Sequence, residues 1–246
     1  MEQYQQALQI WANYPEAHKN LGDALVRLGE VPEAIGQYEQ ALQSKPNYVE
    51  ALNNLGSVLL QLGRTQEAIG HFEEALRVQP NHANTHGNLG NALLQLGQIQ
   101  EAIAQYEDFV RLSPDSAGAH AQLGNAFLRL GKTRETMKEY EQAFRLNPNL
   151  VQAQNNLAWF LATIPPADGG DPVRAVELAQ RVCEQTGYRV ADTINTLAVS
   201  LSAANRINDA IAAAEQALTL GRAAGQTQLV DQIEGQLKQY RARSVH

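Results

Sequence analysis

The chain repeats itself every 34 residues, and this period limits the folds that it can adopt. An aromatic residue and a proline recur at that interval. They are Tyr4, Tyr38, Phe72, Tyr106 and Tyr140, and Pro46, Pro80, Pro114 and Pro148. Self-similarity at a fixed period of this length indicates stacked supersecondary units and not one closed globule. Such an array offers an extended surface and no natural catalytic cleft.

Small residues recur at fixed offsets from these aromatics. The set comprises Leu21-Gly22, Leu55-Gly56, Leu89-Gly90, Leu123-Gly124, a degenerate Leu157-Ala158, and the alanines Ala34, Ala68, Ala102, Ala41, Ala75 and Ala143. Thr136 and Phe109 depart from the alanine positions. Over nearly the whole chain this pattern resembles the tetratricopeptide repeat. The resemblance implies an all-α fold, a right-handed superhelical solenoid of antiparallel helix pairs.

The second repeat shows why these residue types are needed. Apolar residues at three- and four-residue steps predict two amphipathic helices, 49–62 and 65–78. The Leu-Gly glycine and the alanines let the two helix backbones approach, and Phe72 fills the gap beside them. Gly63 follows the first helix, where a left-handed C-cap favours glycine. Each pair needs its neighbours to bury its apolar face.

We expect a single solenoid over residues 1–246. Its predicted parts are a half repeat with only a second helix (1–14), four regular repeats (15–48, 49–82, 83–116 and 117–150), a repeat with an inserted loop at 165–171 (151–189), a divergent repeat (190–224) and a capping helix (226–242). In the capping helix Leu229, Ile233, Leu237 and Tyr240 form one apolar stripe. The basic residues Arg241, Arg243 and His246 are expected to be solvated.

Two irregular places carry further expectations. In the inserted loop, Asp171 is expected to cap a helix that starts at Pro172, and Asp168 with Asp171 offers too few ligands for a calcium site. At the start, Tyr4, Leu8 and Trp11 are expected to face an absent neighbour. The chain would then be a fragment of a longer protein, or another copy would cover this edge. A helix end that frays in water is the alternative.

Composition narrows the class of partner. A net charge of −7 argues against nucleic acid and anionic membranes as partners. No apolar run is long enough to span a bilayer, and the sequence shows no signal peptide. The only cysteine, Cys183, is expected to be a buried packing residue. A cytoplasmic location fits these features, and a periplasmic one stays open.

Polar residues of the first helices predict the binding face. In tetratricopeptide-like arrays the positions just before and two after the Leu-Gly leucine face the concave groove. The candidate peptide-binding residues are Asn20, Asn54, Asn88, Asn91, Gln122, Asn125, Asn156 and Trp159. A carboxamide can pair with both the N–H and the C=O of an extended peptide. This series is similar to the asparagine ladder of O-linked N-acetylglucosamine transferases, and a solvated polar face is the alternative.

Other chemistry is sparse. His18, His86 and His120 share one phase but lie whole repeats apart, so packing roles are expected and no shared metal. Only Lys19 matches a carboxylate clamp. Trp159 could stack on a ligand or pack under the inserted loop.

The sequence shows no phosphate loop, catalytic triad or metal motif, so no catalytic residues and no cofactor are predicted. The predicted function is a non-catalytic interaction scaffold that binds an extended peptide or partner segment in its groove. The alternatives are a substrate-recruiting part of a larger enzyme such as a glycosyltransferase, and self-assembly through the N-terminal edge.

Overall fold

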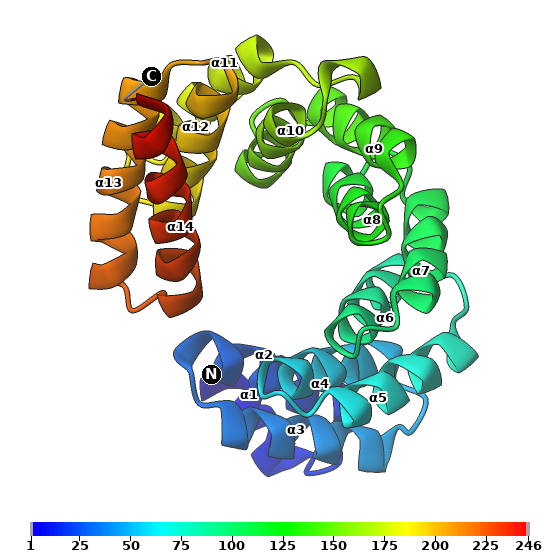
Figure 1. Ribbon diagram of the computed structural model, residues 1–246. Helices are drawn as coiled ribbons and strands as arrows, with labels where there is room; N and C mark the ends of the chain where they lie inside the picture. The colour runs from blue at the N-terminus through cyan, green and yellow to red at the C-terminus, as the bar shows by residue number, and fades with distance from the viewer. Residues whose placement is uncertain (1, 245–246) are drawn as a thin grey trace. The chain divides into compact units, whose positions relative to one another are not determined.

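The computed structural model describes residues 2–244, and every regular element in this range is helical. The chain divides into two compact units, with the boundary between Pro114 and Asp115. Each unit stacks helix pairs in two layers, so each is an all-α tetratricopeptide-like solenoid (Figure 1).

The first unit holds seven helices within the described residues. They are α1 (Glu2–Ile10), α2 (Pro15–Leu28), α3 (Val31–Ser44), α4 (Val49–Gln61), α5 (Thr65–Val78), α6 (Ala83–Gln95) and α7 (Ile99–Leu112). The first helices of successive repeats, α2, α4 and α6, contact one another and form one layer, while α3, α5 and α7 form the other (Figure 1).

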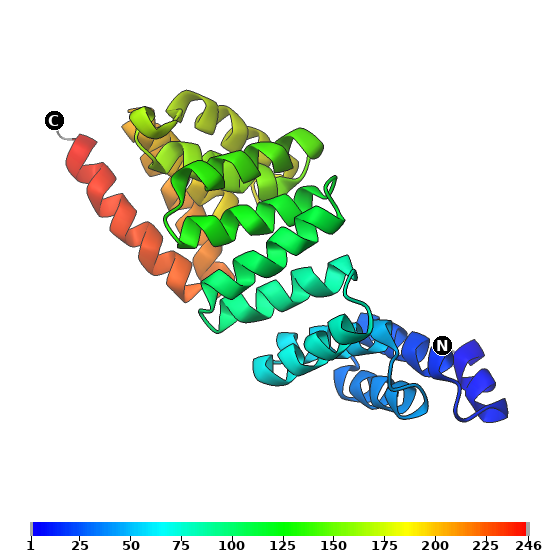
Figure 2. The same ribbon diagram turned by 90° about the vertical axis from the view of Figure 1, so that its right-hand side faces the viewer.

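The second unit holds seven α-helices and one short 3₁₀ turn. They are α8 (Ala117–Arg129), α9 (Thr133–Leu146), α10 (Val151–Thr163), η1 (Pro166–Asp168), α11 (Pro172–Gln185), α12 (Ala191–Ala203), α13 (Ile207–Ala223) and α14 (Thr227–Ser244). The last helix, α14, packs on α13 and runs along one edge of this unit (Figure 2). It buries Ile233, Leu237 and Tyr240.

Glycine and aromatic side chains set the spacing within each helix pair. A Cβ atom on Gly56 would lie 2.6 Å from Cε1 of the fully buried Phe72. Gly22, Gly90 and Gly124 meet Tyr38, Tyr106 and Tyr140 in the same way. The expected role of the Leu-Gly glycine is therefore confirmed, because any larger residue would push the pair apart.

The glycines after the first helices of the regular repeats cap those helices. Gly29, Gly63, Gly97 and Gly131 have φ values of 79°, 76°, 75° and 72°. The left-handed conformation expected at Gly63 is confirmed, and all four positions favour glycine because a Cβ atom is strained there.

The start of the chain differs from the sequence expectation. Tyr4 and Leu8 are partly buried and pack against the apolar cluster of the first unit, which includes Leu21 and Leu25. They are therefore not presented to an absent neighbour. Trp11 is exposed, with 67% of its surface accessible to solvent.

The inserted loop is a short, ordered turn. After α10 ends, η1 leads to Gly169 with φ of 101°. The Asp171 side chain accepts a hydrogen bond of 3.0 Å from the backbone N–H of Arg174, so the expected N-cap of α11 is confirmed. The Arg174 guanidinium then bonds Glu141 of α9 at 2.6 Å and 3.1 Å and ties the two second helices together.

Arg241 and Arg243 at the end of α14 are exposed, as expected, and each also bonds to a neighbouring helix. Arg243 donates from Nη1 to Ser202 Oγ at 2.8 Å, and Arg241 pairs with Glu215 at 2.8 Å. Both contacts attach α14 to α12 and α13. His246 lies outside the described residues.

Candidate functional site

The groove asparagines of the first unit bond to the first helix of the preceding repeat. Asn54 Nδ2 on α4 donates to Asp23 Oδ1 on α2 at 2.8 Å. The same oxygen accepts the Tyr38 hydroxyl at 2.7 Å. Lys19 Nζ donates to the other oxygen, Asp23 Oδ2, at 3.0 Å. Burial, and then the bond to Asp23, raises the pKa of Tyr38 well above its ordinary value, so this hydroxyl remains a donor.

Asn88 on α6 has both of its donor sites occupied. Its Nδ2 donates to Asn53 Oδ1 at 3.0 Å and to Ser57 Oγ at 3.1 Å. The Ser57 hydroxyl donates its proton to the backbone carbonyl of Asn53 at 2.8 Å. In the bond with Asn88, its Oγ is therefore the acceptor. Asn88 therefore presents its remaining group, the acceptor Oδ1, which has no partner among the described residues.

Asn91, one turn further along α6, is oriented the opposite way. Its Oδ1 accepts the Tyr106 hydroxyl at 2.7 Å, and its Nδ2 bonds to no described residue. Residues three apart lie on the same helix face. The face of α6 thus carries an acceptor from Asn88 and a donor from Asn91 side by side, both half-buried.

The second unit repeats part of this arrangement. Asn125 Oδ1 accepts the Tyr140 hydroxyl at 2.6 Å and Asn156 Nδ2 at 2.8 Å. The Oδ1 of Asn156 in turn accepts from Gln152 at 2.9 Å. Burial raises the pKa of Tyr140 strongly, so its hydroxyl stays protonated and keeps this bond. Asn125 is left with its amide N–H groups.

The remaining predicted groove residues lie on α2, α8 and α10 and are all half-buried. Asn20 lies half-buried on α2 and accepts from Lys19 at 3.0 Å. Gln122 and Trp159 are half-buried on α8 and α10. Lys19 is neutralised by Asp23 at 3.0 Å, so the residue that resembled a carboxylate clamp is part of the network.

Sequence reasoning missed the link between the repeat aromatic and the groove. Where the aromatic is Tyr38, Tyr106 or Tyr140, the residue fifteen positions earlier is Asp23, Asn91 or Asn125 and accepts the hydroxyl. Where the repeat aromatic is Phe72, the residue fifteen positions earlier is Ser57. This pairing of residue types was visible in the sequence and could have revealed the network.

His18, His86 and His120 each link the first helix of a repeat to its second helix. His18 and His86 each bond the preceding loop carbonyl through Nε2, at 2.8 Å and 2.9 Å. Through Nδ1 they bond Gln37 and Gln105 of the second helix, both at 2.8 Å. In the next repeat Nδ1 of His120 bonds the buried Glu139 carboxylate at 2.6 Å. Their expected packing role is confirmed.

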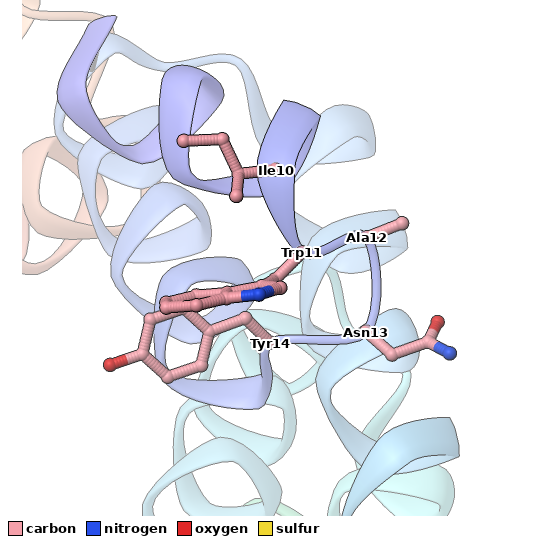
Figure 3. A pocket seen from close by; sticks show the side chains of 5 residues that line it. All are labelled: Ile10, Trp11, Ala12, Asn13 and Tyr14. Carbon is pink, nitrogen blue, oxygen red and sulfur yellow. The ribbon is translucent and has the colours of Figure 1, made fainter.

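A second surface feature lies at the turn between α1 and α2. Ile10, Trp11, Ala12, Asn13 and Tyr14 line an open pocket of 480 Å³. Figure 3 shows the rings of Trp11 and Tyr14 forming its wall, and their centroids are 6.1 Å apart at an interplanar angle of 87°.

The described residues offer little chemistry beyond hydrogen bonding. No three of their histidine, cysteine, aspartate or glutamate side chains form a group that could hold a metal ion. None of the described helices combines the length and the apolar character that crossing a membrane requires. Cys183 is fully buried, and burial raises the pKa of its thiol to about 11, so it is a poor nucleophile at neutral pH.

Two layers of antiparallel helix pairs with a repeated polar face define an α-solenoid protein. Four models of the tetratricopeptide repeat match residues 22–63, 47–115, 117–150 and 190–224. The chain therefore belongs to the tetratricopeptide repeat family. No curated protein matches the chain.

Several solved structures share this fold at low sequence identity. PilF of Pseudomonas aeruginosa is 20% identical, with a TM-score of 0.73 over 90% of this chain and 97% of its own. YrrB, described as a tetratricopeptide repeat protein with an unusual peptide-binding site, is 19% identical, with a TM-score of 0.61 over 82% and 97%. MamA of Desulfovibrio magneticus RS-1 is 23% identical, with a TM-score of 0.60 over 71% and 96%.

Proposed function

We propose that this protein is a non-catalytic interaction scaffold that binds an extended segment of a partner protein on the layer formed by its first helices. One observation carries the proposal. On α6 the internal bonds of Asn88 and Asn91 leave an acceptor and a donor on one helix face. An extended peptide residue carries the complementary N–H and C=O groups.

The internal bonds prepare these amides for binding. Ser57 and Asn53 hold Asn88, while Tyr106 holds Asn91. Little side-chain entropy is then lost when a peptide docks, which increases affinity. The contacts involve peptide backbone, so we expect tolerance of ligand sequence, with selectivity from neighbouring side chains. In the second unit the amide N–H groups of Asn125 are a further candidate donor.

The test begins with selection from a phage-displayed library of random twelve-residue peptides. Selected peptides are labelled with fluorescein and titrated with the wild-type chain and the Asn88→Ala/Asn91→Ala variant. Loss of two hydrogen bonds predicts roughly a tenfold or greater loss of affinity. Circular dichroism should show unchanged helicity.

The matched control is Asn47→Ala/Asn81→Ala, which removes two exposed loop asparagines of the same unit. We expect this control to bind like the wild type. Equal affinity of the wild type and the Asn88→Ala/Asn91→Ala variant would contradict the proposal. So would failure to select any peptide in repeated rounds.

Self-association is a second candidate, supported by the apolar turn between α1 and α2. Ile10 and Trp11 are 73% and 67% exposed, and large apolar side chains gathered in this way often mark protein contacts. We propose that a second copy of the chain covers them. Light scattering should then show concentration-dependent dimers that the Ile10→Ser/Trp11→Ser variant does not form. A strict monomer at high concentration would contradict this candidate.

We also propose a cytoplasmic location, on the sequence features described above, with the periplasm as the alternative. The expected partner is a protein and not a nucleic acid, because the net charge is −7. Fractionation of source cells with an antibody against the chain tests the location directly.

A further inference from the structure

A pocket of 350 Å³ is lined by residues of α5, α6 and α7 and of the turn before α7. Its apolar lining is Ile69 of α5 with Leu89 and Leu93 of α6. Its polar lining is Gln66, Glu73, Gln98, Glu101 and Gln105. The charged members of this set are therefore two carboxylates beside an aliphatic surface.

Neither carboxylate is neutralised internally. Glu73 and Glu101 have no ion-pair or hydrogen-bond partner among the described residues. Gln105 is already engaged, because its Oε1 bonds His86 at 2.8 Å. The nearest arginine along α7, Arg111, is paired with Asp108 at 2.7 Å.

In the preceding repeat, the glutamate equivalent to Glu101 is paired with an arginine. Arg64 precedes α5, and its guanidinium binds Glu67 at 2.7 Å and 2.6 Å. In the next repeat Gln98 stands in place of Arg64, and Glu101 stands in place of Glu67. A similar pair recurs later, where Arg206 binds Asp209 at 2.7 Å. Gln98 thus removes a cation that other repeats supply.

We propose that this pocket takes an arginine side chain from a basic segment of a partner protein. The aliphatic stem of arginine would cover Ile69, Leu89 and Leu93, and its planar head would lie between Glu73 and Glu101. A guanidinium fits carboxylates through two parallel hydrogen bonds. Phosphate-rich ligands such as nucleic acids are disfavoured here by charge. The carboxylates of this pocket lie on α5 and α7, and the groove residues Asn88 and Asn91 are not part of its lining.

The probe is fluorescein-labelled tetra-arginine, and its reference is tetra-citrulline, which has the same shape without the charge. Binding to the full chain is measured by fluorescence anisotropy at low and high salt. We expect tetra-arginine to bind, with weaker binding at high salt, and tetra-citrulline to bind at least tenfold more weakly.

Two variants locate the binding site. Glu73→Gln/Glu101→Gln removes both carboxylates and should weaken tetra-arginine binding at least tenfold. Gln98→Arg recreates the arrangement of Arg64 with Glu67, so its new guanidinium should occupy Glu101 and compete with the probe. Both changes are at exposed positions, so folding should be preserved.

The matched control is Glu33→Gln/Glu50→Gln, which changes the net charge equally at exposed positions of the same unit. It should bind tetra-arginine within twofold of the wild type. If the control loses as much affinity as Glu73→Gln/Glu101→Gln, net charge explains the binding and the proposal is wrong. Absence of tetra-arginine binding to the wild type, or unchanged binding by both pocket variants, would also overturn it.

Discussion

Gly87 and Phe109 are a matched pair of a small and a large residue across the α6–α7 interface. A Cβ atom on Gly87 would lie 2.7 Å from Cε1 and 2.8 Å from Cδ1 of the phenylalanine ring. In three other repeats the position of Phe109 is taken by Ala41, Ala75 or Ala143. The third repeat therefore accommodates the large Phe109 in its second helix because its first helix has a glycine, Gly87, at the facing position.

This relationship predicts opposite effects of one substitution in two backgrounds. Gly87→Ala in the wild type should lower the free energy of unfolding by about 1–3 kcal/mol, because the methyl group overpacks against Phe109. In the Phe109→Ala background the same substitution should be neutral, or stabilising by up to about 1 kcal/mol, since alanine favours a helix interior. Chemical denaturation followed by circular dichroism measures all four proteins of the cycle.

The control for this cycle is Gly36→Ala. Gly36 lies within α3 and has open space where its Cβ would be, so alanine should stabilise or be neutral there. Equal destabilisation by Gly87→Ala in both backgrounds would show that the two residues are not coupled.

The buried pair of His120 and Glu139 gives a second prediction. Two other repeats make the same contact with glutamine, His18 with Gln37 and His86 with Gln105. Glu139→Gln should therefore change the free energy of unfolding by less than about 1 kcal/mol. Glu139→Ala should cost about 1–3 kcal/mol, because it leaves a buried imidazole nitrogen without its acceptor.

Thermal and urea unfolding at pH 7 measure both variants. Substitution of the neighbouring exposed Lys138 by Gln is the control, because its Nζ is 3.6 Å from Glu139 at the surface and should contribute little. If Glu139→Gln is as damaging as Glu139→Ala, the carboxylate charge itself is required and the analogy with glutamine is wrong.

Much of the fold could be predicted because its determinants are local and periodic. The role of Gly56 followed from its fixed offset to Phe72, and the left-handed cap at Gly63 followed from its place after a helix. Asp171 was predicted as an N-cap from its position before Pro172. Each of these depends on neighbours within one repeat.

The arrangement of the candidate site could be predicted only in part. Residue phase placed Asn54, Asn88 and Asn91 on the layer of first helices, but it could not show which amide groups were already used. That depends on contacts between repeats, such as Asn88 Nδ2 with Ser57 Oγ at 3.1 Å. Arg243 is exposed, as expected, but its bond to Ser202 could not be predicted, because it depends on how α14 folds back along the unit.

The third prediction concerns alkaline pH. Burial raises the pKa of the Cys183 thiol to about 11, from about 9 in an unfolded chain. Between these values the unfolded chain releases a proton that the folded chain keeps. The contribution of Cys183 is therefore complete below about pH 9 and is lost as the pH rises through 11, and it amounts to about 3 kcal/mol at most.

Urea unfolding at pH 7 and at pH 10.5 measures this effect in the wild type and in Cys183→Ala. The variant should lose less stability between the two pH values, whatever its stability at pH 7. Its remaining loss is expected from Tyr38 and Tyr140, whose pKa values are also raised by burial. In the folded wild type, a thiol reagent should label Cys183 far more slowly than in urea. An identical pH dependence of the two proteins would show that the thiol does not titrate as described.

The fourth prediction concerns the repeat that lacks the tyrosine hydroxyl. Phe72 is fully buried, and Ser57 stands where the other repeats provide an acceptor for tyrosine. Phe72→Tyr should lower the free energy of unfolding by about 1–3 kcal/mol, because the new buried hydroxyl lacks a partner placed like Asn125. Adding Ser57→Asn should recover most of the loss, since Asn125 accepts from both Tyr140 and Asn156 in the same geometry.

Urea denaturation of the single and double variants measures this recovery, with Ser57→Asn alone as the control. Absence of recovery in the double variant would mean that the tyrosine–asparagine bond is incidental to packing in the other repeats.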